Sequence, residues 1–184
     1  MLNVTFVTSK NWKRQEAAAI LGMPDLRNFK IDLPELQSMD LQDIVLPKAR
    51  AAFEQIGTPV LVDDVALRLH ALHDMPGPFV RFWEERDLYP LTLELMKLQG
   101  NYRALVQCAV GYKDTKHELF VIAEVPGRLV PRTEGEGVGF DFHFIPDGYD
   151  QTYAQMGLAK KSTLSHRYLA FTLMRDKLRE LGLL

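Results

Sequence analysis

The stretch PVLVDD, from Pro59 to Asp64, decides the fold class of this chain of 184 residues. A short apolar run ends in two adjacent carboxylates, which is the pattern of a buried strand that delivers two acids to its C-terminal edge. Open α/β sheets bind their ligands at edges of this kind. We therefore predict an α/β protein whose functional site lies where this strand ends.

Strands alternate with helices on the N-terminal side of this stretch. We expect strands over Val4–Thr8 and Arg27–Leu33, and helices over Trp12–Leu21 and Leu41–Ile56. Pro47 marks either the first turn of the second helix or a kink in it. The opening unit is thus a strand, a tight turn and a helix, which is typical of an α/β fold.

The C-terminal side adds helices and antiparallel strands, so the sheet is expected to be mixed. The pattern predicts two helices, a β-hairpin with a polar turn, a mobile glycine-rich loop and a long amphipathic final helix. Ser162 is the candidate N-cap of that last helix. The segments are Phe79–Glu85, Leu88–Leu98, Arg103–Tyr112, Glu118–Val125, Thr133–Gly139 and the residues from Ser162 onward.

The composition indicates one globular domain over residues 1–184. With 47% apolar and 10% aromatic residues, a chain of this length buries about two-thirds of its unfolded surface in one core. The net charge of -2 gives no excess of basic residues, so nucleic acid is a weak candidate partner. No signal peptide or membrane-spanning run is recognisable. No membrane association and a cytoplasmic location are therefore the default expectations.

Three carboxylates are candidates for metal chemistry. Asp63 and Asp64 at a strand edge suit Mg²⁺ binding or the activation of water, because hard cations prefer oxygen ligands. Glu35 is a third acid at the expected end of a strand, where Pro34 stiffens the backbone. The alternative is that the acid pair caps a turn or helix, and that Glu35 is a solvated surface residue.

Two groups of basic and polar residues are candidates for nucleotide binding. Each surrounds an expected helix N-terminus, where free backbone N–H groups and the helix dipole favour an anion. The alternatives are a solvated basic helix face for the first group and an ordinary capped helix for the second. The groups are Lys10, Lys13 and Arg14 after the first strand, and Lys161, Ser165, His166 and Arg167 near the final helix.

Taken together, these segments and their order resemble the inosine triphosphate pyrophosphatase family, also called the Ham1 family. The match runs across nearly the whole chain, and the joint order of the motifs makes it specific. The residues that carry it are Phe6-Val7-Thr8 with Lys13, Asp32-Leu33-Pro34-Glu35, Lys48, Val60-Leu61-Val62-Asp63-Asp64, Met75-Pro76-Gly77-Pro78, Pro146-Asp147-Gly148-Tyr149 with Gln151-Thr152-Tyr153-Ala154, and Ser165-His166-Arg167.

The resemblance implies a fold and an activity. The fold is an elongated mixed β-sheet flanked by helices, with two lobes, a nucleotide cleft between them, and a homodimeric assembly. The activity is that of a hydrolase acting on acid anhydrides, a Mg²⁺-dependent nucleoside triphosphate pyrophosphatase. Its substrates are the non-canonical purine nucleotides ITP, dITP and XTP, which it converts to the monophosphate plus pyrophosphate.

The resemblance also implies roles for individual residues. Glu35, Asp63 and Asp64 look like metal-binding carboxylates, and Asp64 looks like the catalytic residue that activates water. A triphosphate needs cations and N–H donors, whereas the attacking water needs a carboxylate and a metal. The residues that look like phosphate contacts are Thr8, Lys10, Lys13 and Lys48, and those that look like base contacts are Phe140, Asp141, Lys161, Ser165, His166 and Arg167.

Three departures from the family pattern affect the implied site. Ser9-Lys10 stands where Gly-Asn is usual, and Val65 lacks the hydroxyl usual after the acid pair. In the base pocket, Phe-Gly-Trp-Asp-Pro is replaced by the stretch from Val138 to Phe142, so Val138 stands in place of the stacking aromatic. Stacking of a base on an aromatic ring contributes about 1–3 kcal/mol, so we expect the base preference to be shifted.

The sequence is also compatible with two other functions. A catalytically weak nucleotide-binding or regulatory protein would keep the scaffold while Lys10, Val65 and Val138 altered its site. An enzyme of the same chemistry could instead act on a nucleotide that the family does not prefer. Retention of all three acids and of the basic set argues against the first, and the altered base pocket supports the second.

Overall fold

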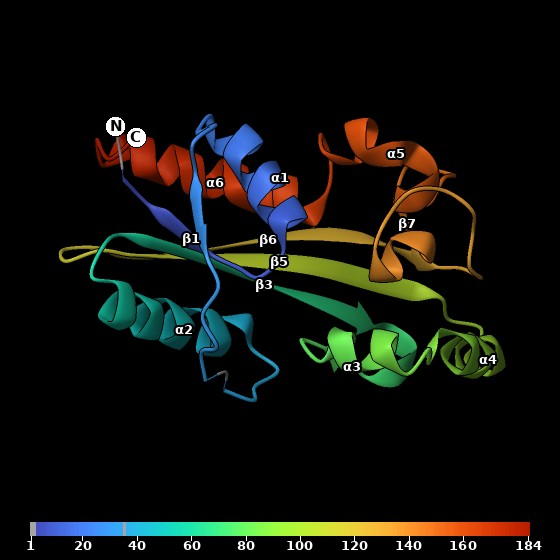
Figure 1. Ribbon diagram of the computed structural model, residues 1–184. Helices are drawn as coiled ribbons and strands as arrows, with labels where there is room; N and C mark the ends of the chain where they lie inside the picture. Colours follow the sequence, from blue (N-terminus) through green and yellow to red (C-terminus); the bar gives the residue numbers. More distant parts are fainter. Residues whose placement is uncertain (1–2, 35) are drawn as a thin grey trace. The chain divides into compact units, whose positions relative to one another are not determined.

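The computed structural model describes residues 3–34 and 36–184 (Figure 1). The chain folds as two compact units. Unit 1 contains the described residues up to Asp64, together with Cys108–Ala123 and Arg167–Leu184. Unit 2 contains Val65–Gln107 and Glu124–His166. Glu35, the implied metal-binding carboxylate, lies outside the described residues.

The order of the elements confirms the alternation of strands and helices that the N-terminal half predicts. The helix over Leu41–Ile56 is found with the predicted bounds. The elements are β1 (Thr5–Val7), α1 (Asn11–Leu21), β2 (Arg27–Phe29), α2 (Leu41–Ile56), β3 (Val60–Leu69), η1 (His70–Leu72), β4 (Pro76–Gly77), α3 (Val80–Glu85), α4 (Tyr89–Gln99), β5 (Arg103–Lys113), β6 (Glu118–Leu129), η2 (Gly139–Phe142), β7 (Phe144–Pro146), α5 (Tyr153–Lys161) and α6 (His166–Glu180).

The strands form one seven-stranded sheet in the order β2-β1-β3-β5-β6-β7, with β4 paired to β3. β1 is parallel to both β2 and β3. β4 is antiparallel to β3, and β7 is antiparallel to β6. The predicted mixed α/β sheet with flanking helices is therefore confirmed. In the described part of the chain, no helix combines the length and the apolar character needed to cross a membrane.

In unit 1, helices α1 and α6 cover one face of the strands and α2 covers the other (Figure 1). The C-terminal cap of α1 is Gly22, whose φ of 69° is left-handed and suits a residue without Cβ. The N-cap of α2 is Asp40, whose carboxylate accepts the N–H of Gln42 at 2.8 Å. The ring of Phe6 on β1 meets that of Phe171 on α6 edge to face, with centroids 5.5 Å apart. Local caps set the helix ends, and aromatic packing joins helix to sheet.

Close packing of α2 against the sheet depends on Gly111 of β5. A Cβ at this position would lie 2.6 Å from Cγ1 of Val45, which is closer than carbon atoms can approach. Pro47 lies inside α2 rather than in its first turn. α2 therefore continues through Pro47 without ending. Two residues earlier in the same helix, Val45 packs directly against Gly111 of the sheet.

In unit 2, α3 and α4 lie on one side of the strands and α5 lies on the opposite side (Figure 1). The indole N–H of Trp83 on α3 donates to the hydroxyl of Thr92 on α4 at 2.8 Å. Tyr153 at the start of α5 is fully buried, and its ring centroid is 5.2 Å from that of Phe144 on β7. These contacts hold the helices of unit 2 to one another and to its edge strand.

One predicted strand boundary is wrong. β3 does not end at the acid pair but runs from Val60 to Leu69, so Asp63 and Asp64 lie within the strand. The residues after the pair are mostly apolar, and Val65 and Leu67 are buried. The apolar run therefore resumes after the acids and keeps the chain extended. The carboxylates consequently lie inside the strand and not at its C-terminal edge.

The predicted start of the final helix is also wrong. Ser162 is the C-terminal cap of a separate helix, α5, and the last helix begins at His166. α5 begins with a capping box, in which Thr152 and Gln155 satisfy each other's backbone N–H groups. Lys161 accordingly lies at the end of α5 and not near the start of α6. The second predicted strand is shorter than expected, since β2 ends at Phe29.

Candidate active site

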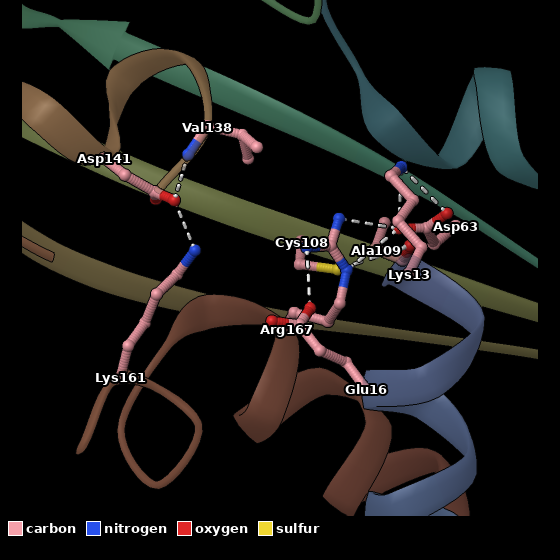
Figure 2. Close-up of polar contacts among 9 residues, drawn as sticks. All are labelled: Lys13, Glu16, Asp63, Cys108, Ala109, Val138, Asp141, Lys161 and Arg167. Carbon is pink, nitrogen blue, oxygen red and sulfur yellow. Dashed lines mark hydrogen bonds and ion pairs between the residues drawn. The ribbon is translucent and has the colours of Figure 1, made fainter. Parts of the chain in front are cut away.

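A buried ion-pair cluster occupies unit 1. The side chain of Asp63 is 2% exposed, and both of its carboxylate oxygens accept from the ammonium of Lys13 at 3.1 Å (Figure 2). The guanidinium of Arg167 donates to Oδ2 of the same carboxylate, from Nη2 at 3.0 Å and from Nε at 3.3 Å. One buried acid is thus bound by two cations from different helices.

Arg167 is fixed on further sides by α1. Its Nη1 donates to Oε2 of Glu16 at 3.3 Å (Figure 2). Its guanidinium also lies 4.9 Å from the ring centre of Trp12. Lys13 and Glu16 are three residues apart on α1, a spacing that places side chains on one helix face. α1 therefore presents a cation to Asp63 and an anion to Arg167 from the same face.

The charges around Asp63 shift its pKa downward. Burial by itself raises the pKa of this carboxyl, but the charges of Lys13, Arg167 and Lys48 outweigh burial and hold the pKa well below its usual range. Asp63 is therefore ionised throughout the neutral range. Lys48 extends from α2, so three helices of unit 1 direct positive charge toward this strand.

Asp64 has different surroundings from its neighbour. Successive side chains of a strand point to opposite faces of the sheet, and Asp64 is partly exposed where Asp63 is buried. Asp63 is committed to two cations, so its oxygens are not open to a further ligand. Of the adjacent acids, Asp64 is the one whose exposure suits contact with water or a substrate.

The turn between β1 and α1 holds the other implied phosphate contacts. The hydroxyl of Thr8 accepts the backbone N–H of Lys10 at 3.2 Å and so shapes the turn. Lys10 occupies the N-cap position of α1, its side chain is exposed, and α1 has no side-chain cap. An uncapped helix N-terminus favours an anion through its N–H groups and dipole. The turn, Lys13 and Lys48 therefore form a cationic set in unit 1.

A second buried pair organises the η2 turn of unit 2. The ammonium of Lys161 donates to Oδ2 of Asp141 at 2.6 Å, and both side chains are almost fully buried (Figure 2). The same oxygen accepts the backbone N–H of Val138 at 2.9 Å. The side chain of Val138 itself remains 45% exposed. Asp141 is thus a structural anchor of the turn that carries the altered base-pocket residue.

Aromatic rings line this part of unit 2. The ring of Phe140 is buried, with its centroid 5.5 Å from the imidazole of His166 and 6.5 Å from the ring of Phe144. Tyr153 stacks on His166 at 6.0 Å. Ser165, next to His166 in sequence, is also buried. Phe140 is therefore a core residue of this cluster, while Val138 is the exposed side chain of the turn.

The predicted site residues thus fall into two sets. Unit 1 brings together Lys13, Lys48, Asp63 and Arg167, and unit 2 brings together Phe140, Asp141, Lys161 and His166. Arg167 was expected among the base contacts, but in the structure it binds the two acids Asp63 and Glu16. Sequence reasoning missed Glu16 and Trp12, although the spacing of Glu16 from Lys13 on α1 was an available signal.

No group of three or more His, Cys, Asp or Glu side chains suited to a metal ion occurs in the ranges 3–34 and 36–184. Mg²⁺ does not require such a cage, because it keeps several waters and commonly binds one or two carboxylates plus substrate phosphates. Partly exposed Asp64 is an oxygen donor of the appropriate kind. The donor set in unit 1 is therefore compatible with a divalent cation that arrives with a phosphate ligand.

The fold and these two residue sets describe an α/β protein in which one strand carries adjacent carboxylates, and the helices packed on the sheet bring cations to that strand. The family model described as the Ham1 family matches residues 4–177, and the chain belongs to this family.

Relatives with assigned names match over most of their length. The chain is 34% identical over 170 residues to the dITP/XTP pyrophosphatase of Methanopyrus kandleri, covering 90% of each chain. It is 37% identical over 180 residues to inosine triphosphate pyrophosphatase 2 of Trypanosoma cruzi, covering 94% of this chain and 90% of the relative.

Solved structures support the same fold. A HAM1 protein from Coxiella burnetii matches with a TM-score of 0.86 and 22% identity, covering 98% of this chain and 100% of that one. The Ham1 protein of Staphylococcus aureus matches with a TM-score of 0.80 and 20% identity, covering 97% and 99%.

Removing the charge of Asp63 should destabilise the protein. We expect Asp63→Asn to lower the free energy of unfolding at pH 7 by about 3–5 kcal/mol, because Arg167 is left as a buried charge with a weakened partner. The depressed pKa of Asp63 contributes stability that is fully present above the unfolded-state pKa of about 3.9 and decreases as the pH falls below that value toward the folded-state pKa. Urea unfolding of both proteins between pH 7 and pH 3 measures the two effects.

The control is Asp25→Asn, which alters an exposed acid elsewhere in unit 1. A difference between wild type and Asp63→Asn that stayed constant down to pH 3, or a stability loss no larger than that of Asp25→Asn, would contradict the assignment of Asp63 as the central paired acid.

Proposed function

We propose that this protein hydrolyses non-canonical purine nucleoside triphosphates, ITP, dITP and XTP, to the monophosphate and pyrophosphate. The observation that carries the proposal is the position of the partly exposed Asp64 beside Asp63, whose buried carboxylate is surrounded by three cations. A triphosphate requires positive charge, and its hydrolysis requires a carboxylate near water. The names of the relatives, inosine triphosphate pyrophosphatase and dITP/XTP pyrophosphatase, support this substrate class.

Phosphate binding is assigned to the basic set of unit 1. Lys13 keeps 20% of its side chain exposed while it binds Asp63, so its ammonium is available to a further anion. Lys48 adds a second ammonium from α2. The hydroxyl of Thr8 and the side chain of Lys10 stand at the uncapped start of α1, where backbone N–H groups favour a phosphate. These four residues supply the donors that a triphosphate needs.

Asp64 is assigned the catalytic role. It accepts a proton from the attacking water while the water oxygen bonds to phosphorus, and the anhydride bond between the α- and β-phosphates breaks to release pyrophosphate. Asp63 keeps Lys13 and Arg167 in place around the strand. The role of Asp63 is thus to position cations, and that of Asp64 is to move a proton.

Mg²⁺ is the proposed cofactor. Asp64 and Glu35 would hold it, whereas Asp63, already bound to two cations, would contribute through charge alone. When bound, the ion would neutralise charge on the phosphates and polarise the phosphoryl oxygens. The donor chemistry favours a hard cation, since all of the candidate ligands are carboxylate oxygens.

Base recognition is assigned to the η2 turn and to the residues just before and at the start of α6. Phe140, Asp141 and Lys161 shape the turn, and Ser165 and His166 complete the set in unit 2. A site that hydrogen-bonds the 6-keto oxygen of hypoxanthine or xanthine rejects a 6-amino group, because buried polar groups are then left unpaired. Discrimination against ATP would therefore come from this region.

A second candidate is the same chemistry with a shifted base preference. It is favoured by Val138, which stands in place of the stacking aromatic and is 45% exposed. A catalytically weak nucleotide-binding protein is the third alternative. Calorimetry that detected tight triphosphate binding without pyrophosphate release would establish that alternative.

We also propose a cytoplasmic homodimer. The resemblance implies the dimer, and three exposed leucines of α4, Leu91, Leu95 and Leu98, lie on one helical face and offer an apolar surface to a partner. We expect light scattering coupled to gel filtration to give twice the chain mass of 21.0 kDa. A mass of one chain across the micromolar range would overturn the proposal.

The activity is tested by pyrophosphate release from a panel of nucleotides. We expect ITP, dITP and XTP to have kcat/KM values at least about 100-fold above those of ATP and UTP, as for a site that hydrogen-bonds the distinguishing group. Removal of Mg²⁺ with EDTA should abolish release, and added Mg²⁺ should restore it. Pyrophosphate release from a different nucleotide would identify that nucleotide as the substrate. No pyrophosphate release from any nucleotide of the panel would reject the proposed hydrolysis.

The role of Asp64 is tested by substitution. Asp64→Asn removes the proton acceptor but keeps the side-chain size, so kcat should fall about 100-fold or more while KM changes little. Asp25→Asn, an exposed acid outside the site, is the matched control and should retain wild-type kcat. An unchanged kcat in Asp64→Asn would remove this residue from the mechanism.

A further inference from the structure

The η2 turn has an additional anchor in unit 2. The backbone N–H of Phe140 donates to Oε1 of Glu84 at 3.2 Å, across 56 positions of sequence. Glu84 lies on α3, a helix that none of the family motifs includes. The turn is therefore held from one side by Lys161 through Asp141, and from another side by a carboxylate of α3.

The fit between Glu84 and the turn is close. Gly139 has a φ of 53°, which is a left-handed conformation that favours glycine. A Cβ at Gly139 would also overlap the carboxylate of Glu84. Two independent features therefore require glycine at position 139. One is its left-handed backbone conformation, and the other is the carboxylate of Glu84, which fills the space that a Cβ would need. Such a contact specifies the position of the whole turn.

The surroundings of Glu84 make its ionised form less favourable than in water. Burial raises the pKa of Glu84, and the neighbouring carboxylates of Asp141 and Glu85 raise it further, while the N–H of Phe140 and the phenol of Tyr89 lower it. The Tyr89 phenol, whose own pKa is raised by burial and by Glu84, also faces this carboxylate. Lys161 is the nearby cation, but it is bound to Asp141. Burial and the two neighbouring carboxylates therefore disfavour the ionised form of Glu84.

The contacts continue to the far end of the turn. Tyr89, the first residue of α4, stacks on His143 with ring centroids 4.3 Å apart, and His143 directly follows η2. The Nδ1–H of His143 donates to the backbone carbonyl oxygen of Val130 at 3.0 Å. Burial lowers the pKa of His143, so its ring is neutral in the neutral range. Glu84 and Tyr89 thus hold the two ends of one turn.

We propose that Glu84 is a positioning residue for nucleobase selection, which acts by fixing the backbone of η2 through the N–H of Phe140. The inference rests on the proposed function, in which η2 contacts the base. An acid whose ionised form is disfavoured by burial and which nevertheless anchors a binding turn is the pattern expected where precision of the site is favoured over stability. Glu84 touches neither the phosphates nor the attacking water in this assignment.

The test compares Glu84→Ala with Glu84→Gln. Alanine removes the acceptor of the Phe140 N–H, so we expect KM for ITP to rise about tenfold, the equivalent of one lost hydrogen bond to a charged acceptor. The preference for ITP over ATP should narrow, and kcat should change less than about twofold because the catalytic groups lie in unit 1. Glutamine keeps an acceptor oxygen and should restore KM.

The pH dependence separates positioning from a purely structural role. The raised folded-state pKa means that ionised Glu84 destabilises the fold, so stability due to this group falls as the pH rises from the unfolded-state pKa through the folded-state pKa. Glu84→Gln should therefore be at least as stable as wild type at pH 7, with wild-type KM. A Gln variant less stable than wild type, or with the KM of the Ala variant, would overturn the proposal.

Two further readouts complete the design. Glu85→Ala alters the neighbouring acid, which is exposed and paired with Arg81, and should leave KM and selectivity unchanged. Hydrogen exchange at the Phe140 amide should be faster in Glu84→Ala whether or not the protein hydrolyses ITP. Faster exchange with no activity in wild type would reject the proposed function alone. Unchanged exchange, or unchanged KM and selectivity in an active enzyme, would reject the role of Glu84.

Discussion

The ionised carboxylate of Asp63 inside the sheet is the constraint on which the arrangement of unit 1 depends. A buried charge is tolerated only when opposite charges and hydrogen bonds compensate for the lost hydration. Lys13 from the first helix and Arg167 from the last provide that compensation on one strand. The two ends of the chain are thereby joined at a single acid, next to the residue assigned to catalysis.

Unit 2 also contains a buried carboxylate that is compensated by a cation, but the residues differ. Asp141 is buried and paired with Lys161, and its second contact is to the backbone of the η2 turn. Gly137 and Gly139 permit this geometry, because a Cβ at either would collide with a carboxylate side chain. Paired acids thus organise both residue sets, through helices in unit 1 and through backbone N–H groups in unit 2.

The structure shows the surroundings of the three residues that depart from the family pattern. Val65 is buried in β3, where its side chain contributes to the core. Lys10 adds an exposed charge at an uncapped helix start, which strengthens the attraction for anions. Val138 leaves an exposed aliphatic side chain on a turn that Asp141 and Glu84 hold firmly. The backbone of the turn is fixed, while the surface offered to a base differs.

The sequence by itself determined the alternating elements, the bounds of α2 and the family, because apolar periodicity, caps and ordered motifs are local signals. It did not determine that β3 continues through the acid pair, because an acid inside a strand is stable only when distant cations reach it. The pairing of Arg167 with Asp63 spans 104 positions, and that of Glu84 with Phe140 spans 56. Contacts of this kind depend on which side chains the fold brings together, and only the tertiary structure decides them.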